Sequence, residues 1–378
     1  MLFFQSKRRI SLALHSQKKR IDLPLFLAVL ITCILGLVFI FEASSVSAFR
    51  DFGDKYHYLK DQSQWLFLGL TLMFFFSFFD YHRLYPLALP LIFITIILLL
   101  AVFLPGLGLK ALGAHRWLDF RAFTLQPAEA AKLALVIYLS AWFSSKERER
   151  LFAFVTLCSL IVGLVIAEPD LGTGIVICVL AVILYFLSGA PWWHFGLLAP
   201  GIFGGILALA VVSPYRLRRL VTFFNPGNDP LGASYHIRQV LLAFGSGGFW
   251  GLGLGKSRQK FEYLPEAMTD SIFAIIGEEI GFIGAILVIA LFVFILWRGI
   301  KIALLAPDRF GQLLAYGISF WISTQAIINL GSMVALLPLT GVPLPFVSYG
   351  GSNLVVTLTG VGILLNISKQ CLAQKKSS

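Results

Sequence analysis

The chain has 378 residues, of which 58% are hydrophobic and 13% charged, and its mean hydropathy is +0.85. These values lie outside the range of soluble globular domains and exclude a soluble enzyme built on one packed core. The formal net charge of +11 could suggest a nucleic-acid partner. However, the basic residues lie in short segments between apolar runs, where membrane topology and anionic lipids explain them better, so no nucleic acid is expected.

The first 20 residues are basic and contain no acidic residue, which is typical of a cytoplasmic tail. The first apolar run is followed by Val46–Ala48, which resembles a signal-peptidase site. The run is long for a secretory signal and further spans follow, so an uncleaved first helix is predicted.

Apolar runs long enough to cross a bilayer as helices recur along the chain and predict about ten spans. They lie at about 24–46, 62–80, 84–104, 127–143, 152–167, 171–189, 193–213, 270–298, 308–335 and 350–369. The predicted fold is therefore all-α: a polytopic integral membrane protein with one membrane domain, residues 24–369. An even number of spans places both tails, residues 1–23 and 370–378, on the cytoplasmic side.

The four cysteines are far apart and suggest neither a disulfide framework nor a metal site. No C-x-x-C, H-E-x-x-H or Walker-type loop occurs, which argues against a zinc enzyme or an ATP-driven one.

One polar segment, about 214–269, is much longer than the other connections and is predicted to be extracytoplasmic. Basic residues outnumber acidic ones in it: Arg216, Arg218, Arg219, Arg238, Lys256, Arg258 and Lys260 against Asp229, Glu262 and Glu266. As simple structure this is a solvated loop. Because it lies above an acid at the mouth of the membrane domain, it is better explained as a binding site for an anionic headgroup such as a pyrophosphate.

At Asp270 the polar loop is predicted to become an apolar helix that continues to about Trp297. Small residues follow at helical spacing: Ala274, Gly277, Gly281 and Gly284. Such a face lets a neighbouring helix approach closely, so Asp270 is expected to face protein or a cavity rather than lipid. Two roles stay open for it, an N-terminal cap with Thr269 or a catalytic group.

Further polar residues lie near other span ends. Glu129 and Lys132, three residues apart, share a helix face and can neutralise each other, but intramembrane ions are also functional candidates. Glu168 and Asp170 lie in a tight turn where a turn role is equally open.

The segment Leu337–Asn353 contains three prolines and three glycines and cannot form one regular helix. Non-helical backbone at membrane depth is tolerated where it is buried in protein or lines a cavity. This segment is therefore expected to form part of the wall of the same site.

Taken together and in order, these stretches resemble the SEDS family of bacterial cell-wall polymerases, which comprises the FtsW, RodA and SpoVE proteins. The resemblance covers about 24–369, and Trp250–Ala267 is most similar to the division-type FtsW members. It is carried by Arg116-Trp117, Gln126-Pro127-x-Glu129-x-x-Lys132, Pro169-Asp170-Leu171-Gly172-Thr173, Leu264-Pro265-Glu266-x-x-Thr269-Asp270, Gly277-Glu278-Glu279 and Pro343 to Ser352.

The chain departs from the family pattern at four positions. Met268 stands where histidine is usual, Ser271 where phenylalanine is usual, Asn353 where serine is usual, and Glu168 where glutamine is common. Met268 and Ser271 flank the acid, so they bear on its environment.

The resemblance implies a glycosyltransferase that polymerises lipid II on the outer membrane face, with undecaprenyl pyrophosphate as leaving group. It implies Asp270 as the general base that activates the acceptor sugar hydroxyl. Positions near the cavity, taken as substrate-binding, are Arg116, Glu129, Lys132, Gln239, Lys256 and Glu262. Cationic side chains, or a divalent cation such as Mg²⁺ or Mn²⁺, would stabilise the pyrophosphate charge.

The resemblance also implies partners and a location. The partners are a class B penicillin-binding transpeptidase and other divisome membrane proteins, and the location is the bacterial inner membrane at the septum. Two other classes stay open, a lipid II flippase and a non-catalytic scaffold that recruits a transpeptidase. A flippase would place its essential ions near the midplane, and no inverted repeat is evident.

Overall fold

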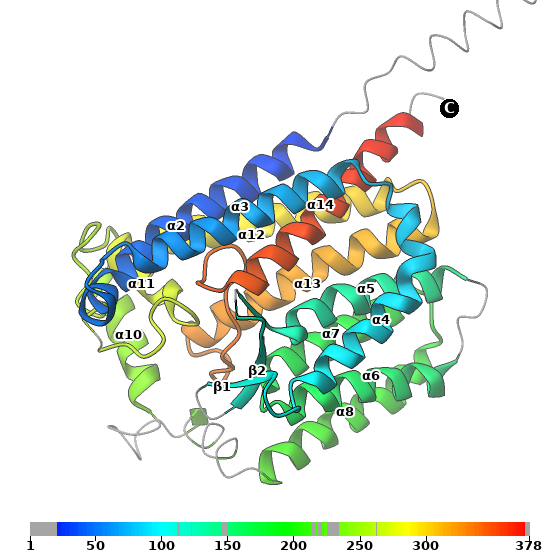
Figure 1. The fold of residues 1–378 in the computed structure, drawn as a ribbon, viewed down its shortest axis with the longest axis horizontal. Helices are drawn as coiled ribbons and strands as arrows, with labels where there is room; N and C mark the ends of the chain where they lie inside the picture. The colour runs from blue at the N-terminus through cyan, green and yellow to red at the C-terminus, as the bar shows by residue number, and fades with distance from the viewer. Residues whose placement is uncertain are drawn as a thin grey trace, which may run out of the picture.

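The structure is a computed structural model that describes residues 21–111, 114–121, 123–145, 150–212, 217, 221, 223–224, 234–261 and 263–374. Long helices lie along the long axis of the molecule, and a small β-sheet, short helices and loops gather at one end (Figure 1). The expected basic tail (1–20), the last residues (375–378) and Glu262 lie outside the described residues. The helix α2 begins and α14 ends at the same end of the bundle (Figure 1).

The described helices are α2 Leu23–Phe52, α3 His57–Phe78, η1 Tyr81–Arg83, α4 Leu84–Ala101, α5 Pro127–Ser144, α6 Leu151–Ala167, α7 Leu171–Leu187, α8 Trp192–Val212, α10 Tyr235–Gly247, α11 Ile272–Glu279, α12 Gly281–Leu304, α13 Arg309–Met333 and α14 Gly351–Gln374. The strands β1 Gly108–Ala111, β2 Ala114–Asp119 and β3 Thr124–Leu125 form an antiparallel sheet in the order β1-β2-β3.

Nine of the ten predicted spans each correspond to one helix in the described part of the chain, and the tenth, 270–298, covers the two helices α11 and α12. The prediction of a polytopic helical membrane protein is confirmed. By length and composition, five of the described helices are long and apolar enough to cross a bilayer. They are α2, the η1–α4 unit, α12, α13 and α14, whereas α6 and α7 are apolar but shorter.

Carboxylates cap three of the described α-helices. The side chains of Asp22, Asp170 and Asp308 accept backbone N–H groups at the starts of α2, α7 and α13. A cap of this kind satisfies a donor that the first turn leaves without a partner.

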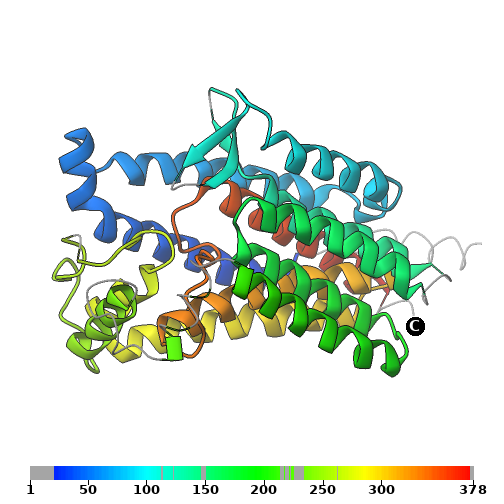
Figure 2. The ribbon, with the colours of Figure 1, turned by 90° about the horizontal axis from the view of Figure 1, so that it is seen from below.

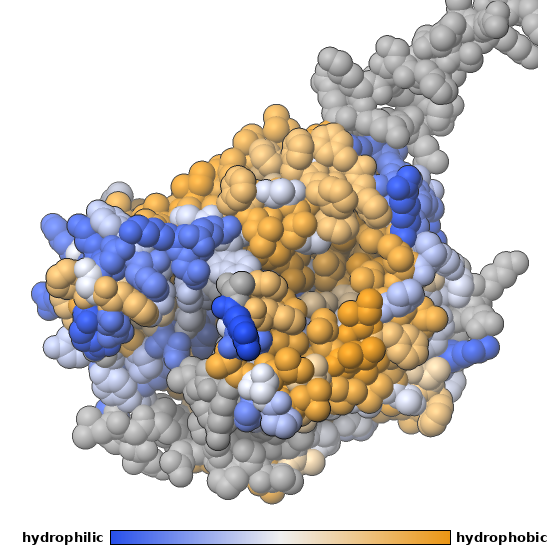
Figure 3. All heavy atoms as spheres, in the orientation of Figure 1, coloured by the Kyte–Doolittle hydropathy of each residue, from blue (hydrophilic) through white to orange (hydrophobic). Residues whose placement is uncertain are grey.

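The surface between the two ends is apolar. Figure 3 shows a continuous hydrophobic area along the helices and hydrophilic residues at the ends. Large exposed apolar side chains include Phe67 and Phe74 on α3 and Phe93 on α4. Such a band would be a liability in water and is the expected surface against lipid. The helices α13 and α14, by contrast, bury most of their residues and form the centre of the bundle.

The predicted continuous helix from Asp270 to Trp297 is wrong. The segment forms two helices, α11 and α12, with the break at Ile280–Gly281. Gly281 has φ +72°, and a Cβ placed on it would lie 2.3 Å from the backbone nitrogen of Gly251. The loop backbone therefore approaches so closely that the residue at 281 cannot carry a side chain and continue the helix.

The N-cap position of α11 is occupied by Ser271 rather than by Asp270. The sequence likewise missed α10 and the small sheet, which lie in segments interpreted as loops. The helix α10 buries Ile237, Val240, Ala243 and Gly247 along one face.

The small-residue face predicted on the Asp270 helix is present in part. A Cβ on Gly277 would lie 2.2 Å from the Phe244 ring of α10, and one on Gly247 would lie 2.1 Å from the carbonyl oxygen of Gly277. The two helices therefore touch through their backbones, as small residues allow.

We predict that Gly247→Ala destabilises the protein, because the new methyl group meets backbone atoms that cannot rotate away. Overpacking of this kind costs about 1–3 kcal/mol. The matched control is Gly245→Ala on the same helix, where a Cβ meets no atom within 4 Å. Thermal unfolding of the purified protein in detergent should show a lower midpoint for Gly247→Ala alone. Equal midpoints for the two variants would contradict this packing.

Candidate active site

Asp270 lies in a compact non-helical loop, residues 265–271. The N–H groups of Thr269 and Ser271 both donate to the carbonyl of Glu266, at 3.2 and 3.1 Å. Glu266 has φ +49°, a left-handed backbone that a residue with a side chain adopts at a cost. The loop therefore depends on contacts from the rest of the structure to keep this shape.

Three of these contacts hold the backbone carbonyls of residues 268–270. Asn329 Nδ2 of α13 donates to the carbonyl of Asp270 at 2.7 Å. Ser348 Oγ donates to the carbonyl of Thr269 at 2.5 Å, and the N–H of Tyr349 donates to the carbonyl of Met268 at 2.9 Å. The position of the Asp270 backbone is thus fixed from both α13 and the segment before α14.

The segment between α13 and α14, residues 334–350, contains no regular helix, as predicted for Leu337–Asn353, whereas Gly351–Asn353 already belong to α14. It is buried at Val342, Leu344 and Val347, and it crosses the end of the molecule that also holds α10 and the sheet (Figure 2). A Cβ on Gly341 would lie 3.3 Å from Asp270 Oδ2. This segment therefore forms one wall beside the carboxylate.

The turn between α6 and α7 packs against the same wall. A Cβ on Gly172 would lie 2.5 Å from the carbonyl oxygen of Thr340. In this turn Asp170 accepts from the N–H and the hydroxyl of Thr173, at 3.0 and 2.8 Å, and from Gln126 Nε2 at 3.4 Å. The predicted structural role of Asp170 in the turn is therefore observed.

Glu168 in this turn, outside both helices, is fully buried, and neither carboxyl oxygen has a hydrogen-bond partner among the described residues. Burial raises the pKa of Glu168 to about 8, the negative charge of Asp170 adds to this rise, and the Arg116 guanidinium partly opposes it. A raised pKa keeps the carboxyl largely neutral at pH 7, which limits the cost of burying it.

Arg116 of β2 supports this turn. Its Nε donates to the carbonyl of Glu168 at 3.2 Å, and its Nη2 donates to the carbonyl of Pro169 at 2.5 Å. The residue is half-buried, so its guanidinium holds the backbone near Glu168 and still borders the polar end of the molecule.

The predicted pair of Glu129 and Lys132 is confirmed. Lys132 Nζ lies 2.8 Å from the Glu129 carboxylate and donates to Gln325 Oε1 at 2.8 Å, and both charged side chains are 1% exposed. Gln325 Nε2 in turn donates to the carbonyl of Pro343 at 3.0 Å. The pair thus lies beneath the 334–350 segment and supports it from inside the bundle.

The basic loop before the acid is folded around two carboxylates of α11. Glu278 accepts from Ser257 Oγ at 2.5 Å and from the N–H groups of Arg258 and Gln259 at 3.1 and 3.3 Å. Glu279 accepts from the N–H of Ser257 at 3.2 Å. These acids serve the loop as acceptors for backbone groups.

The loop cations differ in their surroundings. Lys260 is 8% exposed, donates to the carbonyl of Gly255 at 2.6 Å and lies 3.5 Å from Glu42 of α2. Lys256 and Arg258 are exposed. Gln239 is half-buried on α10, and the remaining candidate, Glu262, is outside the described residues. Of the described cations in the basic segment 214–269, Arg238 on α10 and Lys256 and Arg258 in the loop after α10 are thus the exposed ones that a bound anion could reach.

Sequence reasoning missed several residues that shape the site. Gln325 and Asn329 lie four apart in an apolar helix, a spacing that puts both amides on one face and could have marked them. His236 of α10 contacts Ser271 next to the acid, with Nε2 and Oγ 2.6 Å apart. Nothing in the local sequence pattern predicts that contact.

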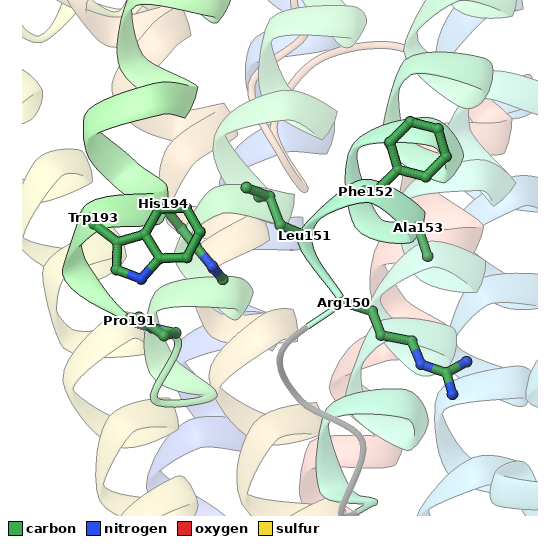
Figure 4. Close-up of a pocket in the computed structure, with 7 residues that line it drawn as sticks. All are labelled: Arg150, Leu151, Phe152, Ala153, Pro191, Trp193 and His194. Atoms are coloured by element: carbon green, nitrogen blue, oxygen red, sulfur yellow. The ribbon is translucent and has the colours of Figure 1, made fainter.

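One concave region lies away from these residues. A cavity of about 480 Å³ opens between the starts of α6 and α8, where Arg150, Trp193 and His194 line it (Figure 4). It is at the opposite ends of these helices from the Glu168 turn. Among the described residues, no group of three or more His, Cys, Asp or Glu could hold a metal ion.

Together, the fold and this end of the molecule define a polytopic helical membrane protein with a carboxylate held on rigid, non-helical backbone beside a basic loop. A family model described as "Cell cycle protein" (FTSW_RODA_SPOVE) matches residues 23–372. The chain therefore belongs to the FtsW/RodA/SpoVE family, and the resemblance seen in the sequence is confirmed.

Individual relatives agree with this assignment. The chain is 40% identical to stage V sporulation protein E of Bacillus subtilis, over 94% of this chain and 98% of that protein. It is also 40% identical to the probable peptidoglycan glycosyltransferase FtsW of Geobacter metallireducens, over 93% of this chain and 95% of the relative.

Solved structures show the same fold. RodA of Thermus thermophilus superposes with a TM-score of 0.68 at 30% identity, over 93% of this chain and 97% of that one. A chain of a peptidoglycan synthase complex, described in work on how polymerization and crosslinking are coordinated, superposes with a TM-score of 0.76 at 29% identity, over 93% and 98% of the two chains.

We predict that Glu129→Gln and Lys132→Met each destabilise the protein more than the double variant does. A single change leaves one ion buried, and breaking a buried pair costs about 3–5 kcal/mol. Thermal unfolding of the four proteins gives the coupling energy. Asp54→Asn is the control, since its pair with Lys60 (2.7 Å) is largely exposed and should contribute little. Additive effects of the two buried changes would show that the ions act separately.

Proposed function

We propose that the protein is a peptidoglycan glycosyltransferase that polymerises lipid II, with Asp270 as the general base. The observation that carries this proposal is the setting of Asp270. Its backbone is held by Asn329 and by the 334–350 segment, and its carboxylate lies beside Gly341, which has no side chain to cover it. A base needs such fixed placement, because general-base catalysis depends on reach to the proton that is removed.

The reaction joins two sugars. The acceptor hydroxyl oxygen attacks the anomeric carbon of the donor sugar, and the bond from that carbon to the pyrophosphate oxygen breaks. The hydroxyl proton passes to the Asp270 carboxylate, and undecaprenyl pyrophosphate leaves with the bonding electron pair. A positioned base contributes typically about 10²–10⁴-fold to such a rate.

The leaving pyrophosphate gains negative charge, which nearby cations would stabilise. Lys256 and Arg258 are exposed cations in the loop between α10 and the acid, Arg238 is exposed on α10, and Arg116 borders the same end of the molecule. Lys260 is already engaged by Glu42 and the Gly255 carbonyl, so its part is to hold the loop. A divalent cation, Mg²⁺ or Mn²⁺, bound together with the substrate would act on the same charge.

The polar end with Asp270 would face the outside of the inner membrane, and the tails 1–23 and 370–378 would face the cytoplasm. The start of α2 and the end of α14 lie at the same end of the bundle, which supports this arrangement (Figure 1).

A relative belongs to a peptidoglycan synthase complex, which supports a class B penicillin-binding transpeptidase as partner. The names of the FtsW relatives support a place with other divisome proteins at the septum.

We predict that Asp270→Asn folds and inserts normally but loses polymerase activity by about 10²–10⁴-fold. The amide keeps the shape of the side chain and removes its basicity, and the contacts to the 268–270 backbone do not depend on the carboxylate. The measurement is the amount and length of glycan made from labelled lipid II by matched quantities of each protein with its partner transpeptidase.

The control is Asp308→Asn at the start of α13, where the carboxylate caps a helix. Asparagine caps about as well as aspartate, so this variant should polymerise at the parental rate. Parental polymer from Asp270→Asn would remove this residue from the mechanism. If that variant also still moved lipid II across vesicle membranes, the transporter class would be favoured.

A further inference from the structure

A histidine of α10 lies in contact with the residue that follows the acid. His236 Nε2 is 2.6 Å from Ser271 Oγ, and the same hydroxyl donates to the carbonyl of Pro265 at 3.1 Å. Ser271 is fully buried. The hydroxyl therefore connects α10 to both ends of the 265–271 loop.

The contact of the Ser271 hydroxyl with the Pro265 carbonyl indicates which group donates in the contact with His236. A carbonyl oxygen can only accept, so the single hydroxyl proton of Ser271 points to Pro265. Ser271 Oγ must then accept from His236, which means that Nε2 carries a proton. Both the Nε2-protonated neutral imidazole and the imidazolium meet this requirement, so the contact holds in either charge state.

The loop needs this support because its backbone is strained. Glu266 is held at φ +49°, and a residue with a side chain keeps such a backbone conformation only where surrounding contacts enforce it. Contacts from α13 and Ser348 hold residues 269 and 270 on one side. The His236–Ser271–Pro265 chain closes the loop from the α10 side.

The helix α10 is well placed to act as a rigid support. Its second half packs on α11, with the rings of Phe244 and Phe273 5.5 Å apart and Gly247 against the Gly277 backbone. Its first half contributes the polar contact through His236. Because α10 is held against α11, the contact with His236 fixes the position of Ser271, the residue that follows Asp270.

We propose that His236 is a positioning residue, whose hydrogen bond through Ser271 to Pro265 sets the orientation in which the loop presents the Asp270 carboxylate to the acceptor hydroxyl. The inference rests on the proposed function and deepens it. His236 acts through Ser271 on the backbone and takes no proton from substrate. Ser271, one of the positions where the chain departs from its family pattern, thus has a partner on α10.

Loss of the His236 contact should misplace the Asp270 carboxylate and so lower kcat. A displacement of about 1 Å at a catalytic group can cost on the order of 10²-fold in rate. His236→Ala should therefore lower kcat at least about tenfold and leave KM for lipid II nearly unchanged. His236→Gln should restore most of kcat, because the glutamine Nε2 amide can donate to Ser271 in the same way. Ser271→Ala should resemble His236→Ala, and the double variant should be no slower than Ser271→Ala.

The experiment measures kcat and KM with labelled lipid II, with the full-length protein bound to its partner transpeptidase. His194→Ala is the matched control: this buried histidine of α8 contacts Tyr185 Oη at 2.5 Å and lines the cavity between α6 and α8. It should lower the unfolding temperature and leave kcat unchanged. A parental kcat for His236→Ala overturns the inference, as does a loss that glutamine does not rescue or one that adds fully to the loss in Ser271→Ala.

Asp270→Asn, run in the same assay, separates this inference from the proposed function. If Asp270→Asn is inactive and His236→Ala is parental, the base assignment stands and the positioning role is wrong. If Asp270→Asn is fully active, the proposed mechanism is wrong, and the positioning role is lost with it.

Discussion

Backbone that leaves a helix inside a membrane protein must find its hydrogen-bond partners within the protein, because lipid offers none. The two non-helical segments that meet at Asp270 satisfy this constraint through α13. Asn329 serves the carbonyls of Asp270 and Val342, and Gln325 serves that of Pro343. Gln325 in turn accepts from Lys132 Nζ. The buried Glu129–Lys132 pair therefore helps to hold the 334–350 segment that lies beside Asp270.

The other acidic residues discussed at this end of the molecule have different structural settings. Glu278 and Glu279 satisfy N–H groups of the basic loop, and Asp170 caps α7. Glu168 is buried with a raised pKa. The backbone of Asp270 is fixed by other residues and its carboxylate borders Gly341, which agrees with the catalytic role proposed for it.

The local sequence pattern predicted most of the helices and the Glu129–Lys132 pair, because apolar runs and i, i+3 spacing involve only neighbouring residues. It predicted the irregular 334–350 segment from prolines. It failed at Gly281, which fits a small-residue helix face but breaks the helix because Gly251 approaches from 30 residues away. The helix α10 is short and only half apolar, so it resembled a loop. The contact of His236 with Ser271 joins distant segments, and no local spacing contains it.

The central claim is that the Asp270 carboxylate receives the proton of the acceptor hydroxyl. The most direct test is a structure of the protein with its partner and with acceptor glycan and a non-reactive lipid II analogue bound. The account predicts an acceptor hydroxyl oxygen within about 2.6–3.2 Å of an Asp270 carboxylate oxygen. Sugars bound elsewhere, for example in the cavity between α6 and α8, with no hydroxyl near Asp270, would contradict it.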